Sequence, residues 1–437
     1  MKVQQLTMKN FRGFDDITID FEQNEPTIFV GVNGVGKSSI LDCLVFLLFI
    51  ITVKNDITSG FFRIEDSYLS NLKNEIKNNE NFMEIKIKNI LKPKLIGWGF
   101  RVSKQKSSKN IIDFLQIQNI AMLKQEIKTG LKDNKNYNIP LFVSYPIHRT
   151  FSNALLNKKV KYEYENLFNQ VSAYNNIFSD RKDDFTSLFN DCRSLEELEY
   201  EKLIKDRSYQ NPYLKGIRDA IYTFLDGFSG FQVQRRNNEK IPRMIIEKRG
   251  KTLRLNQLSE GEKCVLAMVG DLARRLAIAN PGRSNPLEGE GIVLIDEIEL
   301  HLHPQWQRSI INNLTKTFPN CQFIITTHSP QVISEVRQVH LLYETDEGKI
   351  LCDPVRTYGK DSNIILETLM GTVKRSQDIQ DDLNRLFELI GDENIVEAKA
   401  LKAKIEDKVG TGIPELARAD WAIADLEIMQ EEDETDS

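Results

Sequence analysis

A glycine-rich loop near the start of the chain constrains the fold more than any other feature of the sequence. The run at 31–38, Gly-Val-Asn-Gly-Val-Gly-Lys-Ser, follows an extended apolar segment at 27–30 and precedes an apolar segment typical of a buried helix. In this context the glycines let backbone N–H groups turn toward phosphate oxygens at the positive end of the helix. Lys37 would neutralise phosphate charge, and the Ser38 hydroxyl would hold Mg²⁺. The alternative, a glycine turn that binds nothing, leaves these flanks unexplained.

Two later apolar segments end in polar side chains. Residues 291–295 lead into Asp296 and Glu297, and residues 321–327 lead into His328. Ligands bind at the carboxyl ends of strands in a parallel sheet, so these side chains should lie beside the glycine-rich loop. Asp296 would orient the Mg²⁺ shell, Glu297 would polarise the attacking water, and His328 would donate to the γ-phosphate or hold that water in line. Taken singly, the acidic pair could be a solvated strand end and the histidine a structural residue.

A fourth motif, Leu-Ser-Glu-Gly-Glu-Lys at 258–263, precedes a helical stretch. Ser259 with Glu262 three positions on is typical of a capping box, which explains part of the motif structurally. The functional alternative uses the exposed N–H groups at Ser259 and Gly261 to grip a phosphate of a nucleotide held by another protomer. Beside the other motifs we favour the second interpretation. It predicts an ATP site shared between two copies of the chain.

The order of these motifs resembles that of ABC-type ATPases. The chain presents a P-loop, a signature motif, an Asp-Glu strand end, a D-loop-like run at 299–304 and an H-loop-like run at 326–329. The opening Met-Lys-Asn-Phe-Arg-Gly-Phe at 8–14 resembles the RecF/SMC branch. A closer resemblance, carried by residues 294–308 and 318–330 and by Tyr-Gly-Lys-Asp-Ser-Asn at 358–363, is to the short AAA-family ATPases of bacterial antiphage defence, typified by PtuA of Septu systems and of some retrons.

The resemblance is strong over 1–50 and 250–370 and weak over 51–200. It implies ATP and Mg²⁺ as cofactors and a nucleotide-phosphate contact for Arg12. The remaining expected ATP-binding residues lie in the P-loop: Asn33, Gly34, Gly36, Lys37, Ser38 and Ser39. No glutamine can be assigned to a Q-loop, for which Gln116, Gln118 and Gln125 are the candidates.

The expected fold is α/β, an ABC-type ATPase head in which helices flank a mixed sheet. The segment between the P-loop and the signature shows strand-like alternation and polar helices instead of coiled-coil heptads, so we expect a compact inserted α/β lid or dimerisation region and no long arms. The expected divisions are an N-terminal ATPase lobe at 1–50, the insertion at 51–250, a C-terminal ATPase lobe at 251–345, a helical region at 346–430 and an acidic disordered tail at 431–437.

Composition is consistent with a cytoplasmic protein. The formal net charge of -5 argues against indiscriminate coating of DNA, although it leaves room for a local basic groove. One sustained basic stretch could line such a groove or form a solvated strand face: Lys86, Lys88, Lys92, Lys94, Arg101, Lys104, Lys106 and Lys109. The five cysteines lack metal or disulfide spacing, so we expect reduced thiols.

Membrane and zinc alternatives find little support in the sequence. We expect no signal peptide, because Lys2 is followed by polar residues, and the apolar run at 43–53 is shorter than the roughly 20 residues that a bilayer requires. His301 and His303 suggest a metal, yet no third ligand stands at metal spacing. We therefore expect no membrane partner and no zinc.

The C-terminal region carries apolar residues at helical spacing after 375, and one of its helices contains Trp421. Intramolecular packing is one explanation for this surface, and docking of a partner is the other. Nothing in the sequence resembles a Toprim nuclease or an HNH metal site. Any cutting of nucleic acid would then belong to another chain.

Two functions follow from these observations and from the resemblance. In the favoured one, the chain is an ATP-hydrolysing subunit, slow in turnover, that forms an ATP-sandwich dimer or a higher oligomer and regulates a separate HNH-type nuclease. In the alternative, it is a RecF-like DNA-repair ATPase that clamps DNA as an ATP-closed dimer. Direct binding to DNA is left open by the favoured function and is part of the alternative. The identity of the neighbouring gene discriminates between them.

Overall fold

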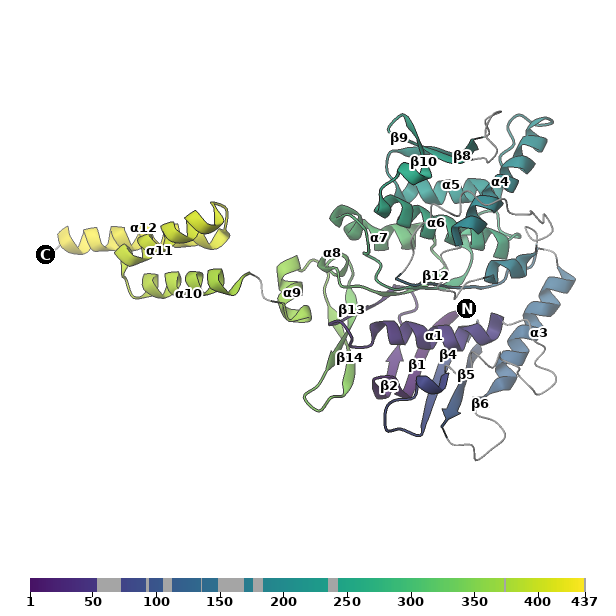
Figure 1. Cartoon of the computed structure of the whole chain (residues 1–437), viewed down its shortest axis with the longest axis horizontal. Coiled ribbons are helices and arrows are strands. Elements are labelled where there is room, and N and C mark those ends of the chain that lie inside the picture. The colour runs from purple at the N-terminus through teal and green to yellow at the C-terminus, as the bar shows by residue number, and fades with distance from the viewer. Residues whose placement is uncertain are drawn as a thin grey trace. The chain divides into compact units, whose positions relative to one another are not determined.

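The computed structural model describes residues 1–52, 72–91, 94–104, 112–134, 136–147, 169–175, 184–234, 243–372 and 375–435. The chain forms two compact units, residues 1–362 and residues 363–437, and each is described by itself (Figure 1).

The first unit is built on a six-stranded sheet in the order β14-β13-β3-β12-β11-β7. Strands β13, β3, β12, β11 and β7 run parallel, and β14 pairs with β13 in the antiparallel sense. Their bounds are β3 Thr27–Val30, β7 Leu141–Tyr145, β11 Gly291–Ile295, β12 Cys321–Thr326, β13 Gln338–Glu344 and β14 Ile350–Arg356. Every residue of β3, β11 and β12 is buried, as near-continuous apolar strands of a parallel sheet should be.

A second, antiparallel sheet has the order β2-β1-β4-β5-β6. Its strands are β1 Lys2–Phe11, β2 Phe14–Asp20, β4 Phe82–Leu91, β5 Lys94–Ser103 and β6 Ile112–Leu115. Buried and exposed residues alternate along β4, so one face of this sheet packs on the core and the other meets solvent. The helix α1 (Lys37–Thr52) packs on the buried face, where the Trp98 indole donates to the Leu47 carbonyl at 2.9 Å.

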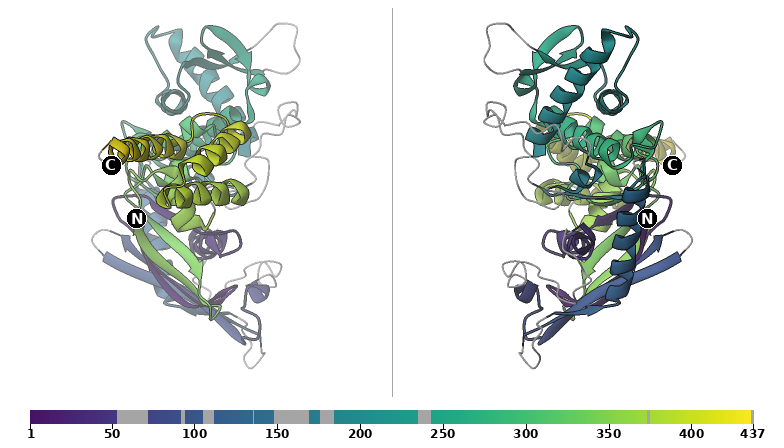
Figure 2. Two further views of the ribbon diagram at one scale, coloured as in Figure 1. Left: turned by 90° about the vertical axis from the view of Figure 1, so that its left-hand side faces the viewer. Right: turned by 90° about the vertical axis from the view of Figure 1, so that its right-hand side faces the viewer.

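Helices complete the first unit. Figures 1 and 2 show α1 on one side of the six-stranded sheet and α6 on the other. A three-stranded sheet, β10-β9-β8, packs with α4 and α5 beyond α6. The bounds are α3 Ile117–Asp133, α4 Asp184–Leu203, α5 Pro212–Phe224, α6 Glu260–Ala279, α7 Pro304–Thr317, α8 Pro330–Ile333, β8 Phe228–Gln234, β9 Arg243–Lys248 and β10 Lys251–Arg254, with 3-10 turns η4 Gln170–Tyr174, η5 Leu255–Gln257 and η6 Pro286–Glu288.

The structure confirms the α/β class and the mixed sheet flanked by helices, and it shows which sheets the strands of the expected insertion join. Within 51–250, strands β4, β5 and β6 belong to the antiparallel sheet and β7 extends the parallel sheet beside β11. Strands of this segment therefore belong to the two larger sheets of the first unit, and a lid or dimerisation role for the segment stays a prediction. The alternation in the sequence reveals the strands, but it does not reveal that their hydrogen-bonding partners lie in the ATPase sheets.

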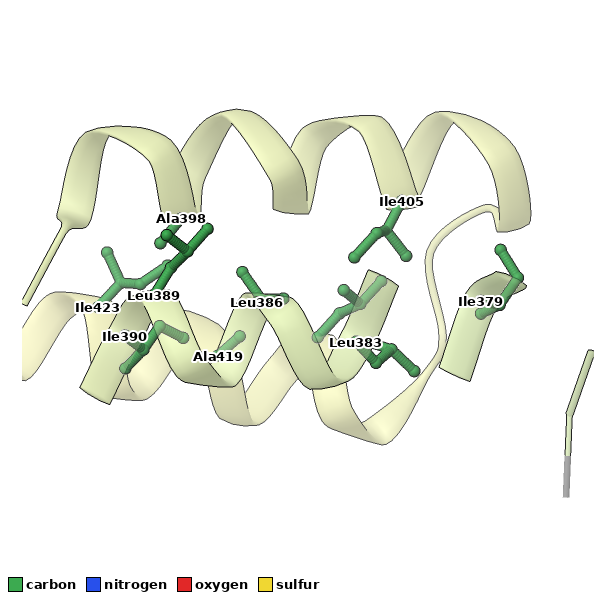
Figure 3. Close-up of a cluster of buried hydrophobic side chains, with 10 residues drawn as sticks. Ile379, Leu383, Leu386, Leu389, Ile390, Ala398, Ile405, Ala419 and Ile423 are labelled. Atoms are coloured by element: carbon green, nitrogen blue, oxygen red, sulfur yellow. The ribbon is translucent and has the colours of Figure 1, made fainter. Parts of the chain in front are cut away.

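The second unit consists of α9 (Ser362–Met370), α10 (Gln377–Gly391), α11 (Ile395–Val409) and α12 (Pro414–Thr435). Helices α10, α11 and α12 share a core of their own (Figure 3), formed by Ile379, Leu383, Leu386, Leu389, Ile390, Ala398, Ile405, Leu416, Ala419 and Ile423. The expected helical region at 346–430 is thus corrected at its start, because residues 350–356 form β14. Helix α12 continues to residue 435, and the disorder expected for the acidic tail at 431–437 stays a prediction.

Among the described helices, none is both long and apolar enough to cross a membrane. All five cysteines are free; four of them are buried, and Cys352 is partly buried.

Candidate active site

The P-loop joins the buried strand β3 to the first turn of α1, as the sequence predicts. Lys37 is the first residue of α1 and is only 6% exposed. Its Nζ donates to the carbonyls of Gly31 and Val32, both at 2.9 Å. The ammonium group is therefore held inside the loop, where it would meet the phosphates of a nucleotide.

Gly34 and Gly36 of the loop must be glycine for different physical reasons. Gly34 has φ 83° and open space around it, so only its backbone conformation requires glycine. Gly36 has φ 108°, and a Cβ there would lie 2.7 Å from the Phe14 ring. Asn33 is exposed at the tip of the loop, while Ser38 and Ser39 are half-buried at the start of α1. All the predicted P-loop residues thus lie in one short segment.

One residue whose role the sequence analysis missed contacts both acidic residues at the end of β11. Thr326, the last residue of the neighbouring parallel strand β12, is completely buried. Its Oγ1 donates to Asp296 Oδ1 at 2.5 Å and accepts from the Glu297 backbone N–H at 2.8 Å. Glu297 lies in the left-handed region with φ 46°, a conformation that a non-glycine residue adopts at some cost. Thr326 therefore fixes both the carboxylate that is expected to hold Mg²⁺ and the backbone of the expected base.

A second missed residue, Glu299, fixes the H-loop. Its carboxylate accepts from Thr327 Oγ1 at 2.8 Å and from the His328 backbone N–H at 2.5 Å. His328 is half-buried, and its pKa is lowered, first by burial and then by the charge of Lys37. The imidazole is therefore kept in its neutral form near pH 7, able to donate one proton and accept another.

The pKa values of Lys37 and His328 depend on the charges of the neighbouring site residues. Burial lowers the pKa of Lys37, and the charges of Glu297, Asp296 and Glu299 oppose that shift. The same lysine lowers the pKa of His328. The prediction that the carboxyl ends of β3, β11 and β12 bring these residues to one edge of the sheet therefore agrees with the structure.

Arg12 lies beside the P-loop but is engaged by side chains of the chain itself. Its guanidinium donates to Asp42 Oδ2 at 2.6 Å and to Ser39 Oγ at 3.2 Å, and it pairs with Glu75. These two carboxylates raise the pKa of Arg12 against the opposing effect of burial. The phosphate contact implied by resemblance stays a prediction, and it would require part of this network to open.

The signature segment contains the capping box predicted from the sequence, and it also leaves the start of the following helix exposed. The Ser259 Oγ accepts from the Glu262 N–H at 3.3 Å, and Glu262 Oε2 accepts from the Ser259 N–H at 2.8 Å, which completes the capping box. Ser259 itself is exposed at the start of α6. Gly261 is buried because α6 approaches the D-loop-like run closely: a Cβ there would lie 2.3 Å from the His301 carbonyl oxygen. This glycine therefore has a structural role within its own chain.

The remaining sequence candidates are placed as follows. His303 caps α7 by accepting from the Gln305 N–H at 3.3 Å, and the described residues contain no cluster of three or more His, Cys, Asp or Glu side chains that could hold a metal. The zinc alternative thus gains no support there. Gln116 precedes α3, and Gln118 and Gln125 lie within it; none is tested as a Q-loop.

The basic stretch lies partly outside the described residues, at Lys92, Lys106 and Lys109. Within the described part, Lys86 and Lys88 occupy the exposed face of β4. Lys86 pairs with Glu84 at 2.5 Å, which favours the solvated strand face of the two alternatives.

Residues 27–334 match the protein family described as "AAA domain, putative AbiEii toxin, Type IV TA system". The chain belongs to this AAA family. It is 30% identical to "Retron Ec83 probable ATPase" of Escherichia coli over 86% of this chain and 77% of that protein. It is 30% identical to "Retron Vc95 probable ATPase" of Vibrio cholerae serotype O1 biovar El Tor over 92% and 86%, respectively. It is 25% identical to "Septu protein PtuA" of Bacillus mycoides (strain KBAB4) over 94% of this chain and 52% of that protein.

These relatives confirm the resemblance read from the motifs. Together with the family match, they identify the chain as an ATPase, as predicted. The site geometry agrees with this activity, because a buried lysine, two acidic residues and a neutral histidine meet at the end of the P-loop strand.

Proposed function

We propose that the chain is the ATP-binding and ATP-hydrolysing subunit of a cytoplasmic antiphage-defence complex, and that it regulates a separate HNH-type nuclease through nucleotide-dependent dimerisation or higher oligomerisation. The names of the retron and Septu relatives support the defence setting. The single observation that carries the nucleotide chemistry is the placement of Lys37, Glu297 and His328 after the neighbouring parallel strands β3, β11 and β12, around a P-loop whose lysine is buried.

The donor set fits ATP with Mg²⁺. A serine hydroxyl at Ser38 and the carboxylate of Asp296 are hard oxygen ligands of the kind that Mg²⁺ prefers. When bound, the ion would neutralise charge on the β- and γ-phosphates. Lys37 would exchange its two loop carbonyls for phosphate oxygens, and the backbone N–H groups around Gly34 and Gly36 would complete the cradle.

Hydrolysis would use the residues at the ends of β11 and β12. Glu297 would accept a proton from the attacking water, and neutral His328 would orient that water or donate to the γ-phosphate. Thr326 and Glu299 would act as positioning residues, because they hold the backbones of Glu297 and His328. Their own side chains are engaged by the protein, which leaves the chemistry to the groups that they orient.

Dimerisation is proposed because the signature would need a nucleotide on another copy. Ser259 and Glu260 are exposed at the N-terminal end of α6, a long helix whose positive end attracts anions. The nuclease is proposed as a separate chain because this sequence carries no recognisable nuclease motif.

Two measurements test the proposal. Lys37→Ala should abolish ATP binding, measured by calorimetry, while the circular dichroism spectrum is retained; unchanged affinity would contradict the site. Co-purification of the tagged full chain with the product of the adjacent gene should recover a nuclease, and the chain lacking residues 376–437 should lose that partner while it keeps ATP binding. Replication or recombination proteins in place of a nuclease would favour the RecF-like alternative.

A further inference from the structure

The second unit carries a large excess of negative charge. Residues 363–437 contain 8 Lys and Arg against 19 Asp and Glu, a formal charge of -11, whereas residues 1–362 contain 50 against 44, a formal charge of +6. Five of the eight cations already pair with carboxylates of the same unit: Arg375–Glu415, Arg385–Glu388, Lys399–Glu427, Lys402–Asp420 and Lys408–Asp382. The excess therefore cannot be neutralised within the unit.

Helix α12 carries apolar side chains on two opposite faces. One face, formed by Leu416, Ala419 and Ile423, lies in the core shared with α10 and α11 (Figure 3). On the other side, a second stripe recurs at helical spacing and is exposed along its length: Ala417, Trp421, Ala424 and Ile428. Trp421 is 81% exposed and Ile428 is 57% exposed, so the three-helix core does not use them. We name these four residues the outer stripe.

The charge around the outer stripe decides what can cover it. A second copy would bring together two units of charge -11, and like charges repel at such a contact. The first unit carries a formal charge of only +6, too small to balance -11, and several cations of its antiparallel sheet already pair with carboxylates of that sheet. Lys9 pairs with Asp16 at 3.8 Å, and Glu84 pairs with Lys86 at 2.5 Å and with Arg101 at 4.0 Å. The complementary occupant is a different protein with a basic surface.

We propose that the outer stripe docks on the nucleic-acid-binding surface of a basic protein partner and shields that surface from DNA. This inference rests on the proposed function, in which the partner is the nuclease. Surfaces that bind nucleic acid combine Lys and Arg, which contact phosphates, with aromatic or apolar platforms on which bases stack. Helix α12 offers matching chemistry: carboxylates replace phosphates, and the indole of Trp421 replaces a base.

The arrangement predicts a particular energetic pattern. Trp421 is the largest side chain of the outer stripe, and buried aromatic anchors dominate interface energies. The carboxylates around it would mainly steer association and make it sensitive to salt. Replacing residues of the outer stripe should weaken docking without unfolding the unit, because their side chains lie outside its core.

The test uses the full chain and the purified nuclease encoded by the adjacent gene. A fluorescein-labelled DNA duplex is bound to the nuclease without a cleavage metal, and anisotropy is followed as the chain is added. Wild-type chain should displace the duplex. The Trp421→Ala, Ile428→Ser double variant should require at least about 30-fold more protein, as expected for loss of an aromatic anchor. Val396→Ser is the matched control, because Val396 is equally exposed at 81% but lies on α11, and it should behave as wild type.

The outcomes separate this inference from the function on which it rests. If the wild-type chain fails to bind the nuclease in a pull-down, both are wrong. If it binds and the double variant binds and displaces DNA equally well, the outer stripe is not the dock, while the proposed function stands. If the wild-type chain and DNA bind the nuclease together, the shielding of the DNA surface is wrong.

Discussion

Thr326→Val should uncouple hydrolysis from nucleotide binding. Valine has nearly the same shape, so the buried site stays filled, but it can neither donate to Asp296 nor accept from the Glu297 N–H. Each lost partner at a buried polar group costs about 1–3 kcal/mol. Part of this cost should appear as a lower free energy of unfolding. In addition, the Glu297 backbone should become more mobile, because its N–H loses the acceptor that holds it in the left-handed conformation. Because small misplacements of a reacting group can cost on the order of 100-fold in rate, we expect ATP turnover to fall by about 10- to 100-fold.

The assay compares steady-state phosphate release with ATP affinity measured by calorimetry. Affinity should change by less than about threefold, because Lys37 and the glycine cradle are untouched. Thr326→Ser retains the hydroxyl group and serves as the matched control; it should recover most of the activity. Wild-type turnover in Thr326→Val would refute the positioning role. An equal loss in the valine and serine variants would assign the effect to packing of the methyl group.

Two further predictions concern the residues that would contact the reacting groups. Glu297→Gln should bind ATP normally, turn it over on the order of 100-fold or more slowly, and accumulate as a closed dimer in size-exclusion chromatography with ATP; wild-type turnover would assign the base to another group. His328 should titrate below the range of an exposed histidine, and Lys37→Met should move its pKa upward, because the lysine charge disfavours the imidazolium. Histidine NMR signals report this titration, and an unchanged or lower pKa in the variant would contradict the electrostatic coupling.

The sequence predicted the site well where short motifs coincide with strand ends. Lys37, Asp296 and His328 each follow or begin an element whose apolar pattern is clear, and parallel strands bring their carboxyl ends to one edge. Thr326 and Glu299 lie in motifs seen in the sequence, but their positioning roles were missed because neither residue type signals such a role by itself. Their partners are separated in sequence by about 30 residues, and only the pairing of β11 with β12 brings them together.

The fold was harder to predict where pairing is non-local. The alternation in 82–88 indicates a strand, but the sequence between the P-loop and the signature does not say that β4 pairs with β1 or that β7 pairs with β11. In the tail, helical spacing indicates amphipathic helices, yet α12 has two apolar faces. Periodicity alone could not assign Trp421 to the outer face and Ile423 to the core.

The central claim is that one ATP site is built from two copies of the chain, and a mixing experiment tests it most directly. Ser259→Arg and Lys37→Ala should each remove ATPase activity from a homodimer. Mixed in equal amounts, they should recover roughly a quarter of the wild-type rate, because half of the dimers are mixed and each mixed dimer has one intact site. Native mass spectrometry confirms that the mixed dimers form. No recovery of activity in a sample that contains them would contradict the shared site.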